Sequence, residues 1–286
     1  MLTIHHRTTY RYREPVRFEP HRLLLRPRES RDLRLIRYDL EISPAATVSW
    51  SQDPFGNAVA TADFQEPADV LDVVSSSQLE LCAAPWPVFD IAFSAASYPF
   101  RYSDDDWTDL GALTAPRYAD PTGRLPAWAR AFVRGDPTDT LALLKDLCQG
   151  VTAWIGYQSR DVGDAQSPIE TLDRGWGSCR DMAVLFVEAV RSLGFGARIV
   201  SGYLHNPDRD RLGSADAGST HAWAEVFVPG AGWITFDPTN RSVGGSNLAP
   251  VAVARDIRQV TPIGGGFAGP AGAFIGLWVG VDVAAT

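Results

Sequence analysis

The sequence contains little of what holds small or metal-dependent folds together. Among its 286 residues are three cysteines, an odd number, and no C-x-x-C pair. We therefore expect neither a disulfide framework nor a zinc site, and no metal ion or other cofactor. The chain does not need them, because 45% of its residues are hydrophobic and a chain of this length can bury a large core. The thiols that we expect to be free are Cys82, Cys148 and Cys179.

Lysine and apolar leader segments are scarce as well. Lys145 is the only lysine, so a lysine-dependent mechanism would have to use that one residue. The first 15 residues carry histidines and arginines where a secretory signal has its apolar segment, and we therefore expect a reducing, cytoplasmic location. The longest uncharged run, residues 259–281, holds two prolines and seven glycines, which makes it a poor membrane span. Without a G-x-x-x-x-G-K motif, a nucleotide site has no support.

Charge is unevenly spread along the chain. The net charge is −8, yet residues 1–40 contain ten arginines and five acidic residues. A basic surface could attract nucleic acid or an anionic membrane. These arginines alternate with apolar residues such as Leu23, Leu25, Leu33 and Leu35, however, as solvent-facing positions of amphipathic strands do. We expect no nucleic-acid partner and no membrane partner, and the sequence leaves the oligomeric state open.

The first 82 residues have the pattern of successive short strands. Turn signals at Asp53-Pro54 and Gly56-Asn57 separate two of them. Residues 83–123 lose this period and become rich in Pro, Asp, Ser and Tyr, which is typical of a connection between domains. We therefore assign residues 1–100 to an N-terminal antiparallel β-domain. The segments with the clearest strand pattern are 2–12, 21–28, 32–42, 47–53 and 57–65.

Residues 101–286 are predicted to form a second domain in which helices precede an antiparallel sheet. Helical periodicity marks residues 139–157, 167–175 and 179–193. The strand patterns that follow lie at 197–204, 221–228 and 232–237, and a last strand at 273–283 is assigned to the same domain. In that last strand, alternate apolar residues from Ala273 to Val283 share one face. The predicted fold class is α+β.

Cys179 lies where a helix begins. Ser178 and Asp181 fit the capping pattern S-x-x-[DE], which places Cys179 in the first helical turn. Unpaired amides and the positive end of the helix dipole stabilise a thiolate and a developing oxyanion there. A plainer alternative is that Cys179 is a small apolar residue at the end of a core helix. We interpret Cys148, within a helix, and Cys82, at the end of a strand, as core residues of this kind.

A base and an orienting acid are predicted on one hairpin. His221 belongs to the strand at 221–228 and Asp237 ends the strand at 232–237. If Phe227 pairs with Trp233, the five-residue loop between the strands sets His221 diagonally to Asp237, within side-chain reach. A slip of one residue would turn Asp237 to the other face. A thiolate, a histidine and a group that fixes the ring are the requirements of nucleophilic acyl chemistry.

These motifs resemble those of the bacterial transglutaminase-like proteins, which belong to the papain-like cysteine enzyme superfamily. The resemblance rests on "GSCRDMA", "ARIVSGYL" and "HAWAEVFVPGAGWITFDPTN", and on "RTTYRYREPV" and "DPFGNAV" in the N-terminal region. It implies a papain-like core after the β-domain, and a triad of Cys179 as nucleophile, His221 as general base and then acid, and Asp237 as orienting group. The segment 205–218 departs from the pattern, and we expect a mobile loop near the site.

Several points stay open at the level of sequence. The oxyanion would bind the amide of Cys179 and a second donor, for which Gln158 and Trp176 are candidates. Glu225 shares the face of His221, and we favour a solvated position for it. Asn206, Asp208 and Asp210 have the spacing of calcium ligands, but an EF-hand loop would then need glycine at position 211 and an acid at 217, where Arg211 and Ala217 stand.

The expected function is a cysteine-dependent attack on the amide bond of a peptide or protein, through a thioester. We favour hydrolysis of the protease or amidase type. Transfer to an amine, as in a protein-glutamine gamma-glutamyltransferase, is the alternative. A non-catalytic binding module on the same fold is the third hypothesis.

Overall fold

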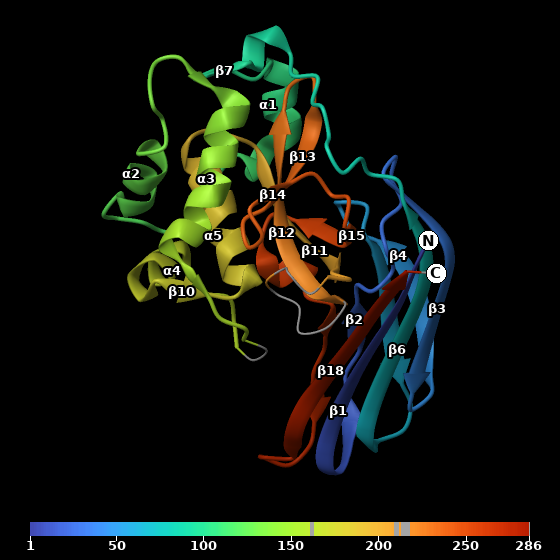
Figure 1. Ribbon diagram of the computed structural model, residues 1–286. Helices are drawn as coiled ribbons and strands as arrows, with labels where there is room; N and C mark the ends of the chain where they lie inside the picture. The colour runs from blue at the N-terminus through green and yellow to red at the C-terminus, as the bar shows by residue number, and fades with distance from the viewer. Residues whose placement is uncertain (161–162, 209–211, 213–217, 286) are drawn as a thin grey trace.

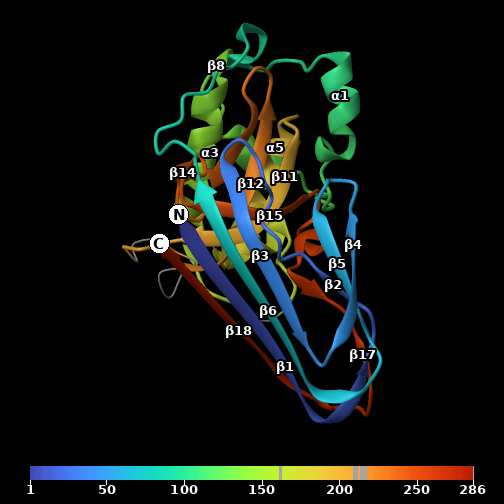
Figure 2. The same ribbon diagram turned by 90° about the vertical axis from the view of Figure 1, so that its right-hand side faces the viewer.

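Two β-sheets packed face to face form the N-terminal part of the molecule. The computed structural model describes residues 1–160, 163–208, 212 and 218–285 (Figure 1). The larger sheet has the order β18-β1-β6-β3, with β17 beside the far end of β1, and the smaller sheet has the order β16-β2-β5-β4 (Figure 2). Apolar residues that alternate along the strands fill the space between the sheets. The strands of residues 1–82 are β1 (Leu2–Phe18), β2 (His21–Leu23), β3 (Leu33–Ser43), β4 (Ala46–Gln52), β5 (Ala58–Phe64) and β6 (Ala68–Leu81).

The last strand, β18 (Phe274–Ala285), belongs to the N-terminal sheet. It pairs antiparallel with β1 from Leu2 opposite Ala285 to Tyr12 opposite Phe274, so the two chain ends lie side by side (Figure 1). Our assignment of this strand to the catalytic domain was therefore wrong. Alternation shows that a segment is a strand, but not which sheet accepts its backbone hydrogen bonds. The domain boundary near residue 100 stays a prediction. Two short strands, β16 (Ile263–Gly264) and β17 (Phe267–Ala268), also pair with N-terminal strands.

The connection after β6 runs along the second part of the molecule and contains only short elements. Ser103 caps α1 by accepting a hydrogen bond from the amide of Asp106. No helix in the described ranges is long and apolar enough to cross a membrane. The elements of this segment are η1 (Phe93–Ala95), β7 (Ser97–Tyr98), α1 (Asp104–Leu110), η2 (Gly111–Leu113), α2 (Arg124–Arg130) and β8 (Thr138–Asp139).

Helices on one side of a five-stranded sheet make up the second part, as predicted for an α+β fold (Figure 1). The sheet has the order β14-β13-β12-β11-β15, and α5 packs on β11 and β12 while α2, α3 and α4 surround it. The helices are α3 (Thr140–Trp154), α4 (Pro168–Arg174) and α5 (Cys179–Ser192), and η3 (Ile257–Val260) follows the sheet. The strands are β9 (Gly156–Tyr157), β10 (Trp176–Gly177), β11 (Ala197–His205), β12 (Gly218–Val228), β13 (Gly232–Asp237), β14 (Ser242–Val243) and β15 (Leu248–Ala254).

Helix α5 is buried on every side from Asp181 to Arg191. Its charged residues Glu188 and Arg191 are both 2% exposed, and an ion pair of 2.7 Å joins them. Glu188 also accepts hydrogen bonds from the amides of Arg117 and Tyr118, and Arg191 donates to the carbonyl of Ala197. Because each buried charge has partners, the helix can be the centre of the core.

Polar groups as well as apolar ones join the two parts of the molecule. Asn57 is fully buried, and its side-chain amide bonds both the carbonyl (2.7 Å) and the amide (2.9 Å) of Val253 in β15. This occupies the backbone groups of an edge strand and explains the Asn of the D-P-F-G-N segment. Farther along the interface, His6 bonds the hydroxyl of Tyr203 in β11 at 2.9 Å. One apolar core runs from β1 and β6 across to the helices.

Candidate active site

Cys179 is the first residue of α5, at the position that the capping pattern predicted. The carboxylate of Asp181 accepts hydrogen bonds from the amide (2.8 Å) and the hydroxyl (2.9 Å) of Ser178. Gly194, with φ of 93°, ends the helix just beyond the cap residue Leu193. Cys179 is partly exposed, whereas residues 181–191 of the helix are all buried. The helix start therefore presents sulfur and unpaired amides at the same point.

Asp181 is the buried centre of this helix start. It is fully buried, and besides Ser178 it binds the guanidinium of Arg160 at 2.9 Å and the amide of Gln166 at 2.7 Å. These bonds tie the loop between β9 and α4 to the residues around Cys179. Gly177 is required there, because a Cβ at this position would lie 2.8 Å from the Cβ of Asp181. The sequence indicated Asp181 as a cap, but not as the anchor of a loop.

The register of the β12–β13 hairpin is the predicted one. Phe227 pairs with Trp233, and the pairs continue to Ala224 opposite Phe236. The ring nitrogen Nε2 of His221 lies 2.9 Å from Oδ2 of Asp237. Both side chains are fully buried. The structure thus brings His221 and Asp237 together, while their catalytic roles stay a prediction.

Asp237 has more partners than the sequence indicated. Its Oδ1 accepts hydrogen bonds from the amides of Thr239 (3.0 Å) and Asn240 (3.2 Å), and its Oδ2 accepts one from Nδ2 of Asn240 at 2.8 Å. Sequence reasoning missed Asn240. The available signal was the D-P-T-N turn, in which an aspartate commonly binds amides two and three residues ahead. These bonds hold the carboxylate of Asp237 beside the imidazole of His221.

The surroundings of the His221 ring also include Trp223 at its face and the second ring nitrogen, Nδ1. The Trp223 ring stacks near that of His221, with centroids 6.1 Å apart and planes at 26°. Nδ1 of His221 is buried and has no well-aligned hydrogen-bond partner among the described residues. Since Asp237 occupies Nε2, Nδ1 is the nitrogen left for the thiol. Catalytic hydrogen bonds are often poorly aligned before substrate binds, which fits this loose contact.

Electrostatic coupling links Cys179 to His221. Burial by itself would raise the pKa of the Cys179 thiol, but hydrogen bonding to His221, the charge of that ring and the amide of Ala222 outweigh it and lower the pKa below 9.0. Burial would likewise lower the pKa of His221. The carboxylate of Asp237 and, after it, Cys179 raise that pKa instead to about 10. The site therefore favours a thiolate beside an imidazolium.

The other two cysteines lack this setting. Cys148 in α3 is buried, as predicted, and burial together with the nearby charge of Asp237 raises the pKa of its thiol. Cys82 follows β6 and is exposed, so its assignment to the core was wrong. A strand pattern places a residue near a sheet but does not tell which strand ends reach solvent. Cys179 is thus the one thiol of the three that is paired with a histidine.

The remaining sequence candidates fall in different places. Parallel pairing of β9 with β10 sets the amide of Gln158 2.9 Å from the carbonyl of Gly177, so Gln158 lies beside the Cys179 segment and is exposed. Trp176 is partly buried and packs against Arg174. Glu225 is not simply solvated, because it binds Arg198 at 2.6 Å. The loop expected to be mobile, and the calcium test at 211 and 217, fall mostly outside the described residues.

Each of the two parts of the chain matches a transglutaminase-like family model. Residues 2–80 match the bacterial transglutaminase-like N-terminal region, and residues 126–238 match the transglutaminase-like superfamily. An uncharacterized protein of Mycobacterium tuberculosis is 30% identical over 276 residues, which cover 91% of this chain and 85% of that protein. The chain belongs to the transglutaminase-like superfamily.

Two further comparisons support the extent of this relationship. An uncharacterized protein of Mycobacterium leprae is 27% identical over 277 residues, covering 94% of this chain and 93% of its own length. The crystal structure of a Cytophaga hutchinsonii protein classed as a cysteine protease superposes with a TM-score of 0.76 at 18% identity, over 100% of this chain and 91% of that one. The fold is therefore shared over the whole length, and the transglutaminase-like superfamily is a family of cysteine-dependent enzymes.

Proposed function

We propose that this transglutaminase-like protein hydrolyses an amide bond of a peptide or protein with Cys179 as nucleophile. The proposal is supported by the position of Cys179 in the first turn of α5 next to His221, whose ring lies 2.9 Å from the carboxylate of Asp237. In keeping with this geometry, the pKa of Cys179 is lowered and that of His221 is raised. Such a displacement favours the ionised sulfur and the protonated ring more than in an isolated thiol and imidazole. The hydrogen bond to Asp237 supplies the charge that holds the proton on the ring.

The reaction follows from these positions. The Cys179 thiolate attacks the amide carbonyl carbon, and the negative charge that develops on the carbonyl oxygen meets the unpaired amides at the start of α5. The imidazolium of His221 gives its proton to the leaving nitrogen, the carbon–nitrogen bond breaks, and a thioester remains. Water then gives a proton to the neutral imidazole and attacks the thioester, which releases the acid and the Cys179 thiolate. Asp237 keeps the ring oriented in both halves.

The acceptor of the acyl group decides between hydrolysis and transfer. A primary amine in place of water would give a new amide, the reaction of a protein-glutamine gamma-glutamyltransferase. We favour water because no motif in the sequence marks a dedicated site for an amine acceptor. We also propose a reducing, cytoplasmic location, which would keep the exposed Cys82 and the partly exposed Cys179 as free thiols.

Thiol labelling tests the nucleophile first. Iodoacetamide at low dose and pH 7 should alkylate Cys179 faster than the exposed Cys82, because the thiolate is the reactive form. Cys82→Ser is the matched control and should keep the fast label, while Cys179→Ala should lose it. Equal slow labelling of both thiols in the wild type would contradict the proposal and favour a non-catalytic binding module.

A product assay then separates the two reactions. Casein and a fluorescent primary amine are incubated with the wild type and with Cys179→Ala. We expect new N-termini without incorporated label, and neither product from the variant. Incorporated label without new N-termini would replace hydrolysis by amine transfer.

A further inference from the structure

The free edges of the N-terminal sheets are protected to different degrees. Unpaired edge strands are templates for another chain, and proteins usually guard them with charges, proline or bulges. The outer strand of the larger sheet, β3, has such charges and a register shift after Leu35. The outer strand of the smaller sheet, β4, has neither charge nor proline, and residues 47–52 are all exposed. In the described part of the chain β4 pairs with β5 alone. The charged residues of β3 are Arg34, Arg37, Asp39 and Glu41.

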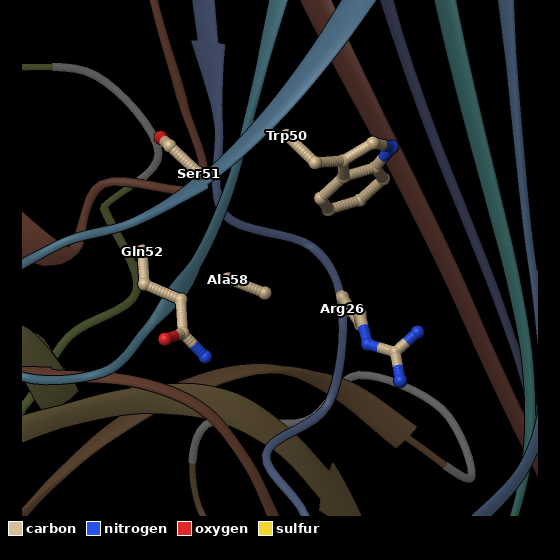
Figure 3. Close-up of a pocket in the computed structure, with 5 residues that line it drawn as sticks. All are labelled: Arg26, Trp50, Ser51, Gln52 and Ala58. Carbon is tan, nitrogen blue, oxygen red and sulfur yellow. The ribbon is translucent and has the colours of Figure 1, made fainter.

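A pocket lies directly beside this unguarded edge. We call it the β4 pocket; its volume is about 480 Å³, and it is lined by Arg26, Trp50, Ser51, Gln52 and Ala58. Figure 3 shows the side chains of Arg26, Trp50 and Gln52 around the small side chain of Ala58. On this face β5 contributes the small side chains of Ala58, Ala60 and Ala62, and the larger Phe64 stands only at the far end of the strand. Small residues on a strand leave the region between the two sheets unfilled.

Tyr38 in β3 contacts both the aromatic and the cationic side chain of the β4 pocket. The ring of Tyr38 in β3 lies edge-to-face with that of Trp50, with centroids 5.9 Å apart. The guanidinium carbon of Arg26 lies 5.8 Å from the centroid of the same tyrosine. Trp50 is nevertheless 49% exposed, so its indole face is available to a ligand. Prepositioned side chains lose little conformational entropy when a ligand binds.

The charge of the β4 pocket selects the ligand. Arg26 is the only ionisable residue that lines it. Among the described residues its ion-pair partner is Glu29, at 3.7 Å and with 54% of its side chain exposed, so the guanidinium is only weakly neutralised. Arg26 belongs to residues 1–40, which hold ten arginines and five acidic residues, so this region attracts an acidic partner. A carboxylate would pair with Arg26 in a bidentate geometry.

We propose that the β4 edge and the β4 pocket bind an extended segment of the protein substrate, which adds a strand beside β4 and places an acidic side chain against Arg26. Backbone hydrogen bonds to β4 supply affinity, and the pocket, which takes one side chain, supplies selectivity. The site lies on the N-terminal domain, away from the strands that carry His221 and Asp237. It rests on the proposed function for the identity of the bound segment. Binding itself needs no catalysis.

A second unguarded edge makes the choice of β4 testable. Strand β18 has no charge between residues 274 and 281, and Ile275, Leu277 and Val279 share the predicted face but are 40–53% exposed. This strand has an arginine of its own nearby, because the guanidinium carbon of Arg11 in β1 lies 5.8 Å from the centroid of the Trp278 ring. A peptide that bound β18 instead would not respond to changes at Arg26, which lies in the other sheet's loop.

Fluorescence anisotropy with a defined probe tests the proposal. The probe is a fluorescein-labelled peptide, Thr-Val-Thr-Glu-Thr-Val-Thr, added to full-length protein that carries Cys179→Ala. The matched probes replace Glu by Gln, or carry N-methyl groups on alternate residues, which removes their backbone donors. We expect the Glu peptide to bind about tenfold more tightly than the Gln peptide and the N-methylated peptide not to bind. Equal binding of all three probes would overturn the proposal.

Charge reversal gives the control on the protein side. Arg26→Glu should weaken the Glu peptide by about tenfold or more and restore binding to a Lys peptide, since the attraction depends on the sign of the pair. Trp50→Ala should weaken both peptides, because both use the indole face. Two results would assign the site to another occupant and overturn the proposal. One is that the wild type self-associates and Trp50→Ala dissociates. The other is that the site binds a sugar, tested with tri-N-acetylglucosamine, in place of the peptide.

The outcome is independent of the proposed chemistry. Iodoacetamide labelling of Cys179 should be the same in Arg26→Glu and in the wild type. Lost peptide binding with intact labelling would refute only the docking site, and intact binding with slow labelling would refute only the proposed function.

Discussion

His6 and His221 are equally buried in two different sheets, but they hold opposite protonation states. His6 in β1 is 2% exposed and bonds two hydroxyls, those of Tyr203 and Thr8, each at 2.9 Å. Burial lowers its pKa to about 4, so the ring is neutral. His221 in β12 is 3% exposed and faces the carboxylate of Asp237, and its pKa is raised to about 10. One carboxylate therefore outweighs burial.

The thiols of Cys148 and Cys179 differ in the same way. Both burial and the Asp237 charge raise the pKa of Cys148, whereas the adjacent imidazolium lowers that of Cys179. Hydroxyl groups form hydrogen bonds to a buried imidazole but leave it neutral. A carboxylate forms a hydrogen bond to the ring and also stabilises its protonated, charged form. The N-terminal sheet uses its histidine to join two parts of the fold, while the second sheet uses its histidine to ionise a thiol.

The largest effect should come from making His221 resemble His6. In Asp237→Asn the ring loses its counter-charge, so the pKa of His221 should fall below 6.5 and activity should drop by about 10⁴-fold. Amide hydrolysis and a histidine titration followed by NMR measure the two changes. Asn240→Ala, which leaves the carboxylate in place, is the matched variant with a smaller loss. An Asp237→Asn protein with wild-type activity would show that the ring needs no acid.

The pH profile of the wild type should be bell-shaped. The thiolate is lost as the pH falls through the lowered pKa of Cys179, and the imidazolium is lost as the pH rises through about 10. On each limb activity should change by about tenfold per pH unit. Because the folded pKa of His221 is above its usual 6.5, the stability contributed by its pair with Asp237 is complete below pH 6.5 and disappears through about pH 10. A rate that still rises above pH 10 is inconsistent with the pair.

Giving His6 a carboxylate tests the comparison in reverse. Nε2 of His6 lies 2.9 Å from the hydroxyl of Thr8, so Thr8→Asp places an acid where Asp237 stands relative to His221. The pKa of His6 should rise from about 4 to above its usual value of 6.5. An NMR titration measures this, with Thr8→Asn as the neutral control and the Cys179 labelling rate expected to stay constant. A folded variant in which His6 still titrates near 4 would refute the explanation.

The smallest effect is expected at the hydroxyl that joins the two sheets. Tyr203→Phe removes the partner of His6 Nδ1, which should lower the free energy of unfolding by about 1 kcal/mol, or somewhat more because the ring nitrogen stays buried. Urea unfolding measures the loss. Activity and the pKa of Cys179 should not change, and a large loss of activity would mean that this contact also positions His221.

Much of the candidate site could be predicted from local patterns. The spacing of Ser178 and Asp181 fixed the start of α5, and the loop length between Phe227 and Trp233 fixed the hairpin register. Both are short-range features, in which few backbone conformations satisfy the hydrogen bonds. The family resemblance then connected Cys179 to the hairpin, a connection that periodicity alone does not make.

Long-range features were missed or misplaced. The ladder between β1 and β18 joins the two ends of the chain, and Asp181 binds Arg160 across a loop. The sequence pattern of β18 is the same whichever sheet it joins. Asn240 contributes through a turn whose side-chain directions depend on the carboxylate that it binds.

The sequence by itself determined which residues could do acyl chemistry and which segments would be helices and strands, because residue type, capping and alternation act over a few positions. Tertiary structure alone decided the charges. Whether a buried histidine is neutral or positive, and whether a thiol is inert or ionised, depends on which groups from distant segments face it within a few ångströms, where little water remains to screen them.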